Sequence, residues 1–211
     1  MEFLRVQELF VRADLCPTES FYPEDVVISP SRSFIERIAE IEADGIIPEK
    51  SLFGRQRYIN LRQLVHDETI LRMFAGGMYV KQYLAPWDPH GVIFPTGSVI
   101  DQLVLNRGKA LPLLFMKGGD VQNERLSAFL KSDYGPFVVM IMVGSFLVKS
   151  VNTVGEIGRH YNRCEQFGYF WMGSSIILLF PKGCVELLCT EGMKVECGAP
   201  LVRFVSARFV A

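Results

Sequence analysis

A glycine and two serines interrupt a run of aromatic and aliphatic residues near the carboxyl end of the sequence. The segment reads FWMGSSIILLF over residues 170–180, so Gly173 and Ser174 stand between two apolar stretches. A serine hydroxyl becomes a nucleophile when a neighbouring base takes its proton. We therefore treat this pair as a candidate site, against the simpler interpretation of Gly173 as a β-bulge.

Two other segments carry residue types that simple packing does not require. Residues 83–90 read YLAPWDPH, a loop bracketed by prolines that holds Asp88 and His90, one of only three histidines. Residues 123–125 read NER and stand between apolar stretches. The simpler interpretations are a turn capped by Asp88 and a surface ion pair of Glu124 with Arg125.

Length and composition limit the class of protein. The chain has 211 residues, which suits one domain better than two. Its 22 basic and 23 acidic residues give a formal charge of −1, which argues against a nucleic-acid partner. With 49% hydrophobic and 21% charged residues, the composition excludes disorder and permits a large core.

The cysteines indicate reduced thiols in a cytoplasmic protein. There are five of them, an odd number without a CxxC pair, and the first residues do not have the pattern of a secretory signal. We therefore expect no disulfide framework and no metal site. The longest apolar stretch, 137–148, is too short to span a bilayer and predicts a buried strand pair.

The elements needed to position these residues are mostly strands. Residues 1–15 have the spacing of an amphipathic helix, which could cap the core or touch a lipid surface. Prolines between residues 16 and 30 mark a connecting arm. We therefore divide the chain into an amphipathic helix with its arm over 1–25 and a catalytic domain over 26–211.

The remaining pattern predicts an α+β, mainly β fold: a sandwich or distorted barrel of short strands with an N-terminal helical arm. Residues 33–43 fit a short helix or an exposed strand, and 60–74 fit a helix capped by Asn60. Predicted strands cover 26–30, 78–85, 91–95, 98–105, 112–116, 136–148, 167–173, 175–180, 184–189 and 200–205.

Five blocks, taken in order, resemble the phosphatidylserine decarboxylase family over residues 26–202. They are YLAPWDPHGVI from Tyr83, an NER preceded by LLFMKGGDVQ, MVGSFLVKSVN from Met142, GYFWMGSSIILLF from Gly168, and the segment from Gly192 to Leu201. The ordered set is specific, and on it the chain is identified as a member of the family.

The resemblance implies a cofactor made from the chain itself. In the family, the serine corresponding to Ser174 attacks the carbonyl of the residue corresponding to Gly173, and the resulting ester undergoes β-elimination. Hydrolysis of the dehydroalanine then leaves a pyruvoyl group on the second fragment. That group forms a Schiff base with the substrate amine and accepts the electrons left when CO₂ departs. His90 matches the family histidine that serves decarboxylation, here as general acid.

Two positions depart from the family pattern. The family's SPxDG segment reads SPSRS here, so Arg32 stands in place of an aspartate, and Ile93 stands in place of a second histidine that acts as base. An arginine cannot orient an imidazole as a carboxylate does, and an isoleucine has no group that accepts a proton. This predicts poor self-cleavage unless another group activates Ser174, and His90, His160 and Asp44 are the candidates. Pro89 and Gly91 also differ from the family, which affects the expected headgroup contacts.

The leading hypothesis is a pyruvoyl-dependent decarboxylase acting on an amino acid, an amine-bearing metabolite or an aminophospholipid. Ser174 would be the cofactor precursor, Gly173 its cleavage partner and His90 the acid. The alternatives are an uncleaved homologue that uses the same pocket for a cyclisation or condensation, and a non-catalytic binding protein. We expect a cytoplasmic protein with peripheral membrane contact left open. A homodimer is also an expectation, since family members often pair through their sheets.

Overall fold

The structure is a computed structural model that describes residues 16–50, 56–65, 68–109, 111, 119–145, 151–170 and 174–205. The predicted helix over 1–15, the predicted strand over 112–116 and the candidate residue Gly173 lie outside this part of the chain.

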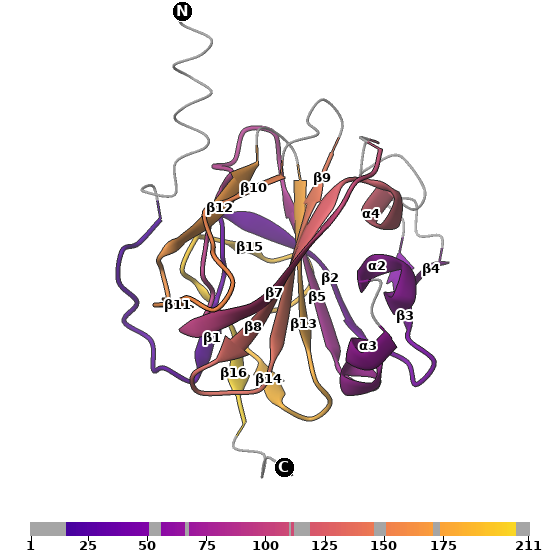
Figure 1. Cartoon of the computed structure of the whole chain (residues 1–211), viewed down its shortest axis with the longest axis horizontal. Coiled ribbons are helices and arrows are strands. Elements are labelled where there is room, and N and C mark those ends of the chain that lie inside the picture. Colours follow the sequence, from indigo (N-terminus) through magenta and orange to yellow (C-terminus); the bar gives the residue numbers. More distant parts are fainter. Residues whose placement is uncertain are drawn as a thin grey trace, which may run out of the picture.

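An eight-stranded antiparallel sheet forms the centre of the molecule (Figure 1). Its strand order is β11-β7-β8-β9-β13-β5-β2-β15. The two strands richest in large aliphatic residues, β9 and β13, lie side by side in its interior and are buried throughout. The strands are β2 (Ser33–Glu40), β5 (Met78–Leu84), β7 (Ser98–Asn106), β8 (Arg125–Ser132), β9 (Val138–Gly144), β11 (His160–Tyr161), β13 (Ser174–Phe180) and β15 (Lys194–Val195).

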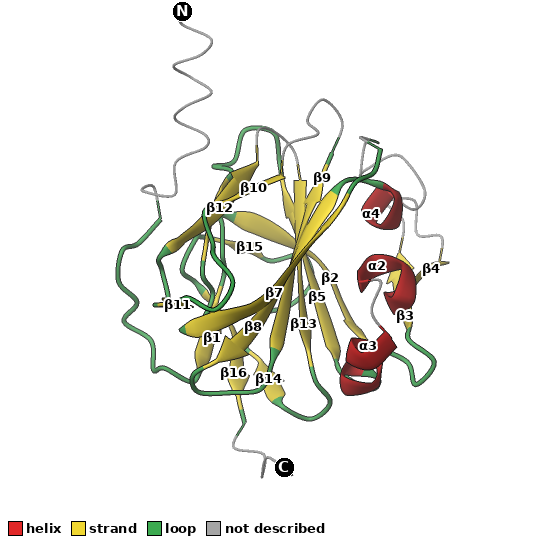
Figure 2. Ribbon diagram, in the orientation of Figure 1, coloured by secondary structure: helices red, strands yellow, loops and turns green. Residues whose placement is uncertain are grey.

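The helices and a hairpin cover one face of this sheet (Figure 2). Alternate residues of a strand point to opposite faces, so Ile177 and Leu179 of β13 pack here with Leu64 and Phe74. Val121 packs against the same cluster from a third helix. These elements are α2 (Leu61–Val65), α3 (Glu68–Phe74), α4 (Gly119–Gln122), β3 (Ile46–Lys50) and β4 (Gln56–Asn60).

Two three-stranded sheets supply the packing on the other face. Ile176 and Leu178 of β13 share a core there with Phe94, Phe167 and other large side chains. One small sheet has the order β1-β16-β14 and the other β10-β12-β6. Their strands are β1 (Val26–Ile28), β6 (Gly91–Ile93), β10 (Val151–Thr153), β12 (Gln166–Phe170), β14 (Val185–Leu187) and β16 (Pro200–Phe204).

This layered arrangement confirms the α+β, mainly β prediction. The central sheet is open, with β11 and β15 at its edges, so the fold is the sandwich of the two predicted alternatives. Residues 33–40 form a strand rather than a helix. Asn60 caps the helical region as predicted, because its Oδ1 accepts a hydrogen bond from the Arg62 amide at 2.9 Å.

Some element predictions were wrong. The stretch 137–148 contains one buried strand, β9, where a strand pair was predicted, and residues 146–148 lie outside the described part. The long strand β8 and the hairpin β3–β4 were not predicted.

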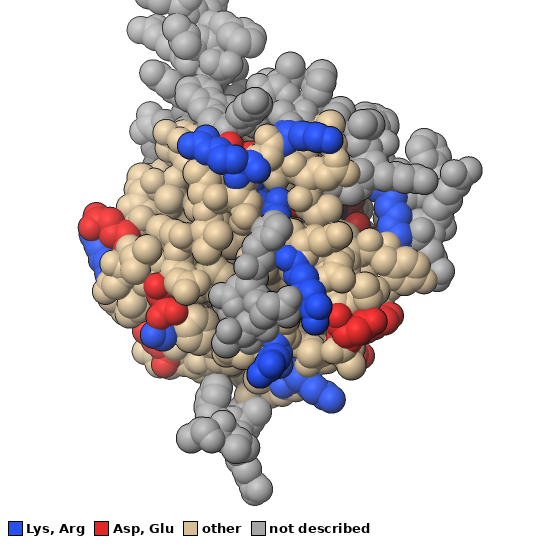
Figure 3. All heavy atoms as spheres, turned by 45° about the vertical axis from the view of Figure 1, so that its right-hand side comes forward, with Lys and Arg blue, Asp and Glu red and all other residues tan. Residues whose placement is uncertain are grey.

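Among the described residues, no helix is long and apolar enough to cross a bilayer. Figure 3 shows charged residues of both signs spread among uncharged ones on the face it displays.

The prediction of reduced thiols was wrong for two of the five cysteines. Cys16 and Cys197 form a disulfide, whereas Cys164, Cys184 and Cys189 are free thiols. The two bonded residues are 181 positions apart in sequence. Their proximity depends on the arm lying against the C-terminal strands, and no local pattern encodes that.

Candidate active site

Ser174 begins β13, an interior strand with hydrogen-bonded neighbours on both sides. It lies opposite Leu84 of β5 and opposite Gly144 of β9. The residue is completely buried, and its Oγ has no hydrogen-bond partner among the described residues. A buried hydroxyl without a partner is costly, and Ser174 shares this property with Ser127 and Ser175. Ser174 differs from them in its place at the first residue of β13, opposite the residue after which the His90 loop begins.

The loop after β5 is folded by Asp88, which confirms the turn-cap interpretation. The Asp88 amide donates to the carbonyl of Ala85 at 2.9 Å, and Asp88 Oδ2 accepts from the Ala85 amide at 3.0 Å. Asp88 is buried, and its Oδ1 lies 3.8 Å from Nε of Arg32. The loop therefore has a fixed conformation at the end of the strand that pairs with Ser174.

His90 follows in the same loop and is completely buried. Its Nδ1 lies 2.5 Å from the backbone carbonyl oxygen of Asp88, so Nδ1 must carry the proton and donate it. In the neutral ring the lone pair is then on Nε2. Burial lowers the pKa of His90 below its usual 6.5, against a smaller opposing effect of the hydrogen bond to Asp88. The imidazole is therefore neutral at neutral pH and able to accept a proton.

The sheet brings the His90 loop and Ser174 to one end of the molecule. The loop starts directly after Leu84, which is the residue opposite Ser174. The His90 carbonyl also accepts a hydrogen bond at 3.0 Å from the amide of Phe170, the last residue of β12. Two of the three segments singled out in the sequence thus meet where β13 begins.

The third segment is attached to the same end through Gly144. Asn123 Nδ2 donates to the carbonyls of Gly144 and Leu111, both at 2.8 Å, and its Oδ1 accepts from the Leu111 amide at 2.8 Å. The Gly144 amide donates to the carbonyl of Glu124 at 2.9 Å. Asn123 therefore fixes the strand end that faces Ser174.

The predicted surface ion pair of Glu124 with Arg125 is wrong, because both residues are buried. Arg125 donates instead to the backbone carbonyls of Leu64, Gln63 and Val121 at 2.8, 2.6 and 2.8 Å. Glu124 Oε2 lies 3.3 Å from Nη1 of Arg107. Arg125 thus joins α2 to α4, a structural role that its polar neighbours in sequence could not reveal.

The two positions that depart from the family pattern offer no substitute for the residues they replace. Arg32 Nε lies 3.4 Å from Oε1 of Glu196, in addition to its ion pair with Asp88. Ile93 is buried in β6, where its amide donates to the carbonyl of Pro30 at 2.9 Å. Neither side chain can orient an imidazole as a carboxylate does or accept a proton.

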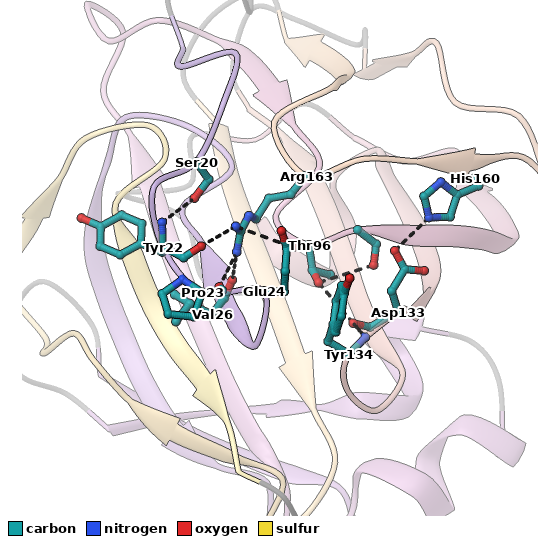
Figure 4. A network of polar contacts seen from close by, with 12 residues as sticks. Ser20, Tyr22, Pro23, Glu24, Val26, Thr96, Asp133, Tyr134, His160 and Arg163 are labelled. Carbon is teal, nitrogen blue, oxygen red and sulfur yellow. Dashed lines mark hydrogen bonds and ion pairs between the residues drawn. The ribbon is translucent and has the colours of Figure 1, made fainter.

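Of the other candidates for activating Ser174, neither His160 nor Asp44 lies at this end of β13. His160 is exposed on the edge strand β11, where its Nε2 lies 2.8 Å from Oδ2 of Asp133 (Figure 4). Asp44 follows β2, whose residue Glu40 pairs with Met78 at the far end of β5 from Leu84. Of the three candidates, His90 is the one whose loop follows Leu84, the residue opposite Ser174.

Gln82 is a buried polar residue that the sequence analysis missed. It lies opposite Ile176, two residues beyond Ser174 on the same face of β13. Its Oε1 accepts hydrogen bonds at 2.8 Å from the hydroxyls of Ser29 and Ser33. These serines flank Arg32, so Gln82 binds the SPSRS segment to the central sheet. A glutamine within the apolar strand MYVKQYL was the available signal.

Lys81 occupies the opposite face of the same strand and was also missed. Its Nζ lies 2.7 Å from Asp120 Oδ2, 3.2 Å from Glu36 Oε2 and 3.6 Å from Glu49 Oε1. Burial lowers the pKa of Lys81, but the three carboxylates outweigh it and raise the pKa overall. Burial raises the pKa of Glu49. The cluster joins β2, β3 and α4 to β5.

A cavity of about 380 Å³ lies away from Ser174 and His90. It is lined by the arm, including Glu24, and by Gly97, Tyr134 and Arg163. Several of these polar groups are drawn in Figure 4. None of the proposed site residues lines this cavity.

Comparisons with known proteins identify the family to which the chain belongs. The family model for phosphatidylserine decarboxylase matches residues 6–203. Three similar proteins are each named phosphatidylserine decarboxylase proenzyme, and they are 26–30% identical to this chain.

The alignments cover most of this chain and of each relative. The protein of Saccharophagus degradans is 26% identical over 92% of this chain and 74% of its own length. The protein of Legionella pneumophila strain Lens is 29% identical over 83% of this chain and 69% of its own length. The protein of Anoxybacillus flavithermus is 30% identical over 88% of this chain and 70% of its own length. On this match, and on the ordered motifs around Ser174, the chain belongs to the phosphatidylserine decarboxylase family.

Proposed function

We propose that this protein is a pyruvoyl-dependent decarboxylase that releases CO₂ from an amine-bearing phospholipid. The observation that supports this most is the buried, unpartnered hydroxyl of Ser174 at the start of an interior strand, with the His90 loop at the same end. The relatives are named proenzymes, which fits a chain that matures by cleavage.

The surroundings of Ser174 suit a cofactor precursor. No hydrogen bond from the described residues holds its Oγ, so none has to break before the oxygen attacks the carbonyl carbon of Gly173. In the proposed cleavage the peptide nitrogen takes the proton and the peptide becomes an ester. Elimination then leaves a carboxylate on Gly173 and a dehydroalanine at residue 174. Hydrolysis of the dehydroalanine releases its nitrogen as ammonia and leaves a pyruvoyl group.

A pyruvoyl group at residue 174 would supply an electron sink for the bond that breaks when CO₂ leaves. His90 provides the proton movements in this proposal. Its neutral ring holds a proton on Nδ1 against the Asp88 carbonyl and presents a lone pair on Nε2. Because Ser174 Oγ has no hydrogen-bond partner among the described residues, cleavage would require the two side chains to come within hydrogen-bond distance before His90 accepts the hydroxyl proton. His90 would later act as general acid toward the substrate carbon.

A matched pair of serine variants tests the proposal. Ser174 and Ser175 are adjacent, both are buried, and both hydroxyls are unpartnered among the described residues, but they point to opposite faces of the sheet. Ser174→Ala should abolish CO₂ release from phosphatidylserine vesicles, whereas Ser175→Ala should retain it. Equal release by Ser174→Ala and the parent protein would contradict the proposal.

A lipid substrate also requires contact with a membrane surface, which the amphipathic pattern of residues 1–15 could provide. Co-sedimentation with phosphatidylserine vesicles, compared for the full chain and a chain lacking residues 1–15, tests this. Equal binding would remove that segment from the proposal without affecting the role of Ser174.

A second candidate function is favoured by Arg32 and Ile93. Because these residues replace the family's cleavage aspartate and histidine, the chain could remain intact and use the site at the start of β13 for a cyclisation or condensation. The two candidates differ in one observable, the integrity of the peptide bond between residues 173 and 174.

A further inference from the structure

The Cys16–Cys197 disulfide connects two parts of the chain that lie on either side of the proposed cleavage point. Cys16 starts the arm, and Cys197 belongs to the segment between β15 and β16. Their Cα atoms are 5.4 Å apart, within the usual range for a disulfide. Cleavage between residues 173 and 174 would place these two cysteines in different fragments.

The contacts around the disulfide show that the arm is fitted to this position. Gly198 has a φ of +84°, and a Cβ on it would lie 2.4 Å from Cγ of Pro17. Glycine is therefore required beside Cys197 for the arm to approach. The Gly198 amide also donates to the carbonyl of Ser29 at 2.9 Å. The disulfide is thus one part of a closely packed junction.

Arg163 holds the rest of the arm in place (Figure 4). Its Nη1 donates to the carbonyls of Pro23 and Val26 at 2.7 and 2.9 Å, and its Nη2 donates to the carbonyl of Tyr22 at 2.7 Å. The arm then continues into β1, which pairs with β16 of the C-terminal segment. The arm is therefore bound by both of the fragments that cleavage would create.

We propose that Cys16–Cys197 is a reducible covalent link between the two fragments of the mature protein. This inference rests on the proposed self-cleavage. Strand β13 is held by β5 and β9 on both sides, so the native fold keeps the fragments together without the link. The link adds a covalent attachment that persists when the fold is lost, and it fixes Cys16 against the segment between β15 and β16.

The redox step is a thiol–disulfide exchange. Oxidised glutathione accepts two electrons from the Cys16 and Cys197 thiols, and two reduced glutathione molecules and the protein disulfide result. A dithiol reductant reverses the step: it gives two electrons and two protons to the Cys16–Cys197 bond and becomes a disulfide itself. Cys164 packs in the same buried cluster as Cys16. Burial raises its pKa, which keeps it a poor nucleophile for internal exchange.

The test is a denaturing gel of the full chain, purified without reductant and equilibrated with a glutathione redox buffer. The sample is run with and without dithiothreitol. We expect a single species near 23.9 kDa without reductant, and two species, residues 1–173 and 174–211, with it. Cys16→Ser should give two species in both lanes. The matched control Cys184→Ser removes a free thiol and should behave like the parent protein.

Two species from the parent protein without reductant would overturn the link while leaving the self-cleavage intact. One species in both lanes would instead mean that cleavage has failed. In that case, alkylation of the denatured, unreduced chain followed by peptide mapping decides the matter. Cys16 and Cys197 should stay unmodified while Cys164, Cys184 and Cys189 react. Alkylation of Cys16 would overturn the link whether or not the chain is cleaved.

Discussion

Ser174 lies directly opposite Gly144 in the antiparallel pair of β13 with β9, and the Gly144 carbonyl is bound by the side chain of Asn123. This relationship explains why a polar triplet far from Ser174 in sequence belongs to the same site. Strand β13 positions the candidate nucleophile Ser174, and the buried side-chain amide of Asn123 positions the end of β9 that lies opposite it.

Replacing Asn123 should therefore impair both stability and cleavage. Asn123→Leu keeps the side-chain size but removes three hydrogen bonds, so the Gly144 carbonyl and the Leu111 amide lose their side-chain partner and the Leu111 carbonyl keeps only the Ser145 hydroxyl at 3.5 Å among side-chain donors. Each unsatisfied buried group costs about 1–3 kcal/mol. We expect a lower free energy of unfolding in urea and slower cleavage, measured on reducing gels. Asn162→Leu, at an exposed position, should change neither. Cleavage of folded Asn123→Leu at the parent rate would contradict the positioning role.

His90 should make self-cleavage dependent on pH. Its folded-state pKa lies below 6.5, so the ring stays neutral, and able to accept a proton, to a lower pH than an exposed histidine. The cleavage rate should fall only in the acidic range below 6.5. His90→Gln should cleave far more slowly at every pH. His160→Gln, at an exposed position on β11, should keep the parent profile. An unchanged rate in His90→Gln would remove His90 from the mechanism.

The same pKa shift has a consequence for stability. The folded protein binds a proton at His90 less readily than the unfolded chain does. The contribution of the neutral His90 ring to the free energy of unfolding is therefore fully present above pH 6.5. It is lost as the pH falls from 6.5 through the lowered folded pKa. Urea midpoints of the parent protein should therefore fall over this interval more steeply than those of His90→Gln. Parallel curves for the two proteins would contradict the buried neutral ring.

Lys81 should be necessary for stability in a way that a surface lysine is not. Lys81→Met would leave the carboxylates of Glu36, Glu49 and Asp120 close together without a cation. Removing one partner of a buried ion pair costs about 3–5 kcal/mol. The control Lys131→Met removes an exposed ion pair with Asp101 and should cost about 1 kcal/mol or less. Similar urea midpoints for the two variants would refute this.

Acid should partly rescue Lys81→Met. The pKa of Glu49 is already raised in the folded protein. The contribution of Glu49 to the free energy of unfolding is therefore fully present below its unfolded pKa of 4.5, and it is lost as the pH rises through the folded pKa. Removing Lys81 takes away the charge that lowers this pKa. The stability gap between Lys81→Met and the parent protein should therefore narrow as the pH falls toward 4.5. A gap that widens in acid would count against the carboxylate cluster.

Restoring the family's cleavage residues distinguishes the two candidate functions. If the parent chain stays intact, the double variant Arg32→Asp with Ile93→His should begin to cleave. Ile93 is buried, and Arg32 lies beside Asp88 and Glu196, so the new aspartate would meet two like charges. Folding must therefore be checked by circular dichroism. A folded double variant that remains whole would weigh against the uncleaved candidate.

The sequence was most informative where local pattern and function coincide. The apolar run after Ser174 predicted a strand, and the proline-bracketed loop predicted the turn that Asp88 caps. Both follow from short-range chemistry: large aliphatic residues favour a buried strand, and an aspartate binds nearby amides. The same reasoning failed for Glu124 and Arg125, which are both buried, because Arg125 binds backbone carbonyls of α2 and α4 that are distant in sequence or hidden from a local pattern.

The long-range relationships could not be predicted for the same reason. Gln82 and Lys81 are neighbours in one strand but point to opposite faces, one toward Ser29 and Ser33 and the other toward three carboxylates. The disulfide joins residues 181 positions apart and depends on the arm crossing to the C-terminal segment. Only the assembled sheet determines which polar residues meet.

The most direct test of self-cleavage is a denaturing intact-mass spectrum of the untagged, fully reduced protein. Self-cleavage predicts two species, residues 1–173 and 174–211, with the smaller one lighter by one ammonia than a fragment that begins with serine. The smaller species should also react with a carbonyl reagent, and Ser174→Ala should show neither property. A single species at 23.9 kDa would contradict the pyruvoyl mechanism and leave the uncleaved homologue as the better account.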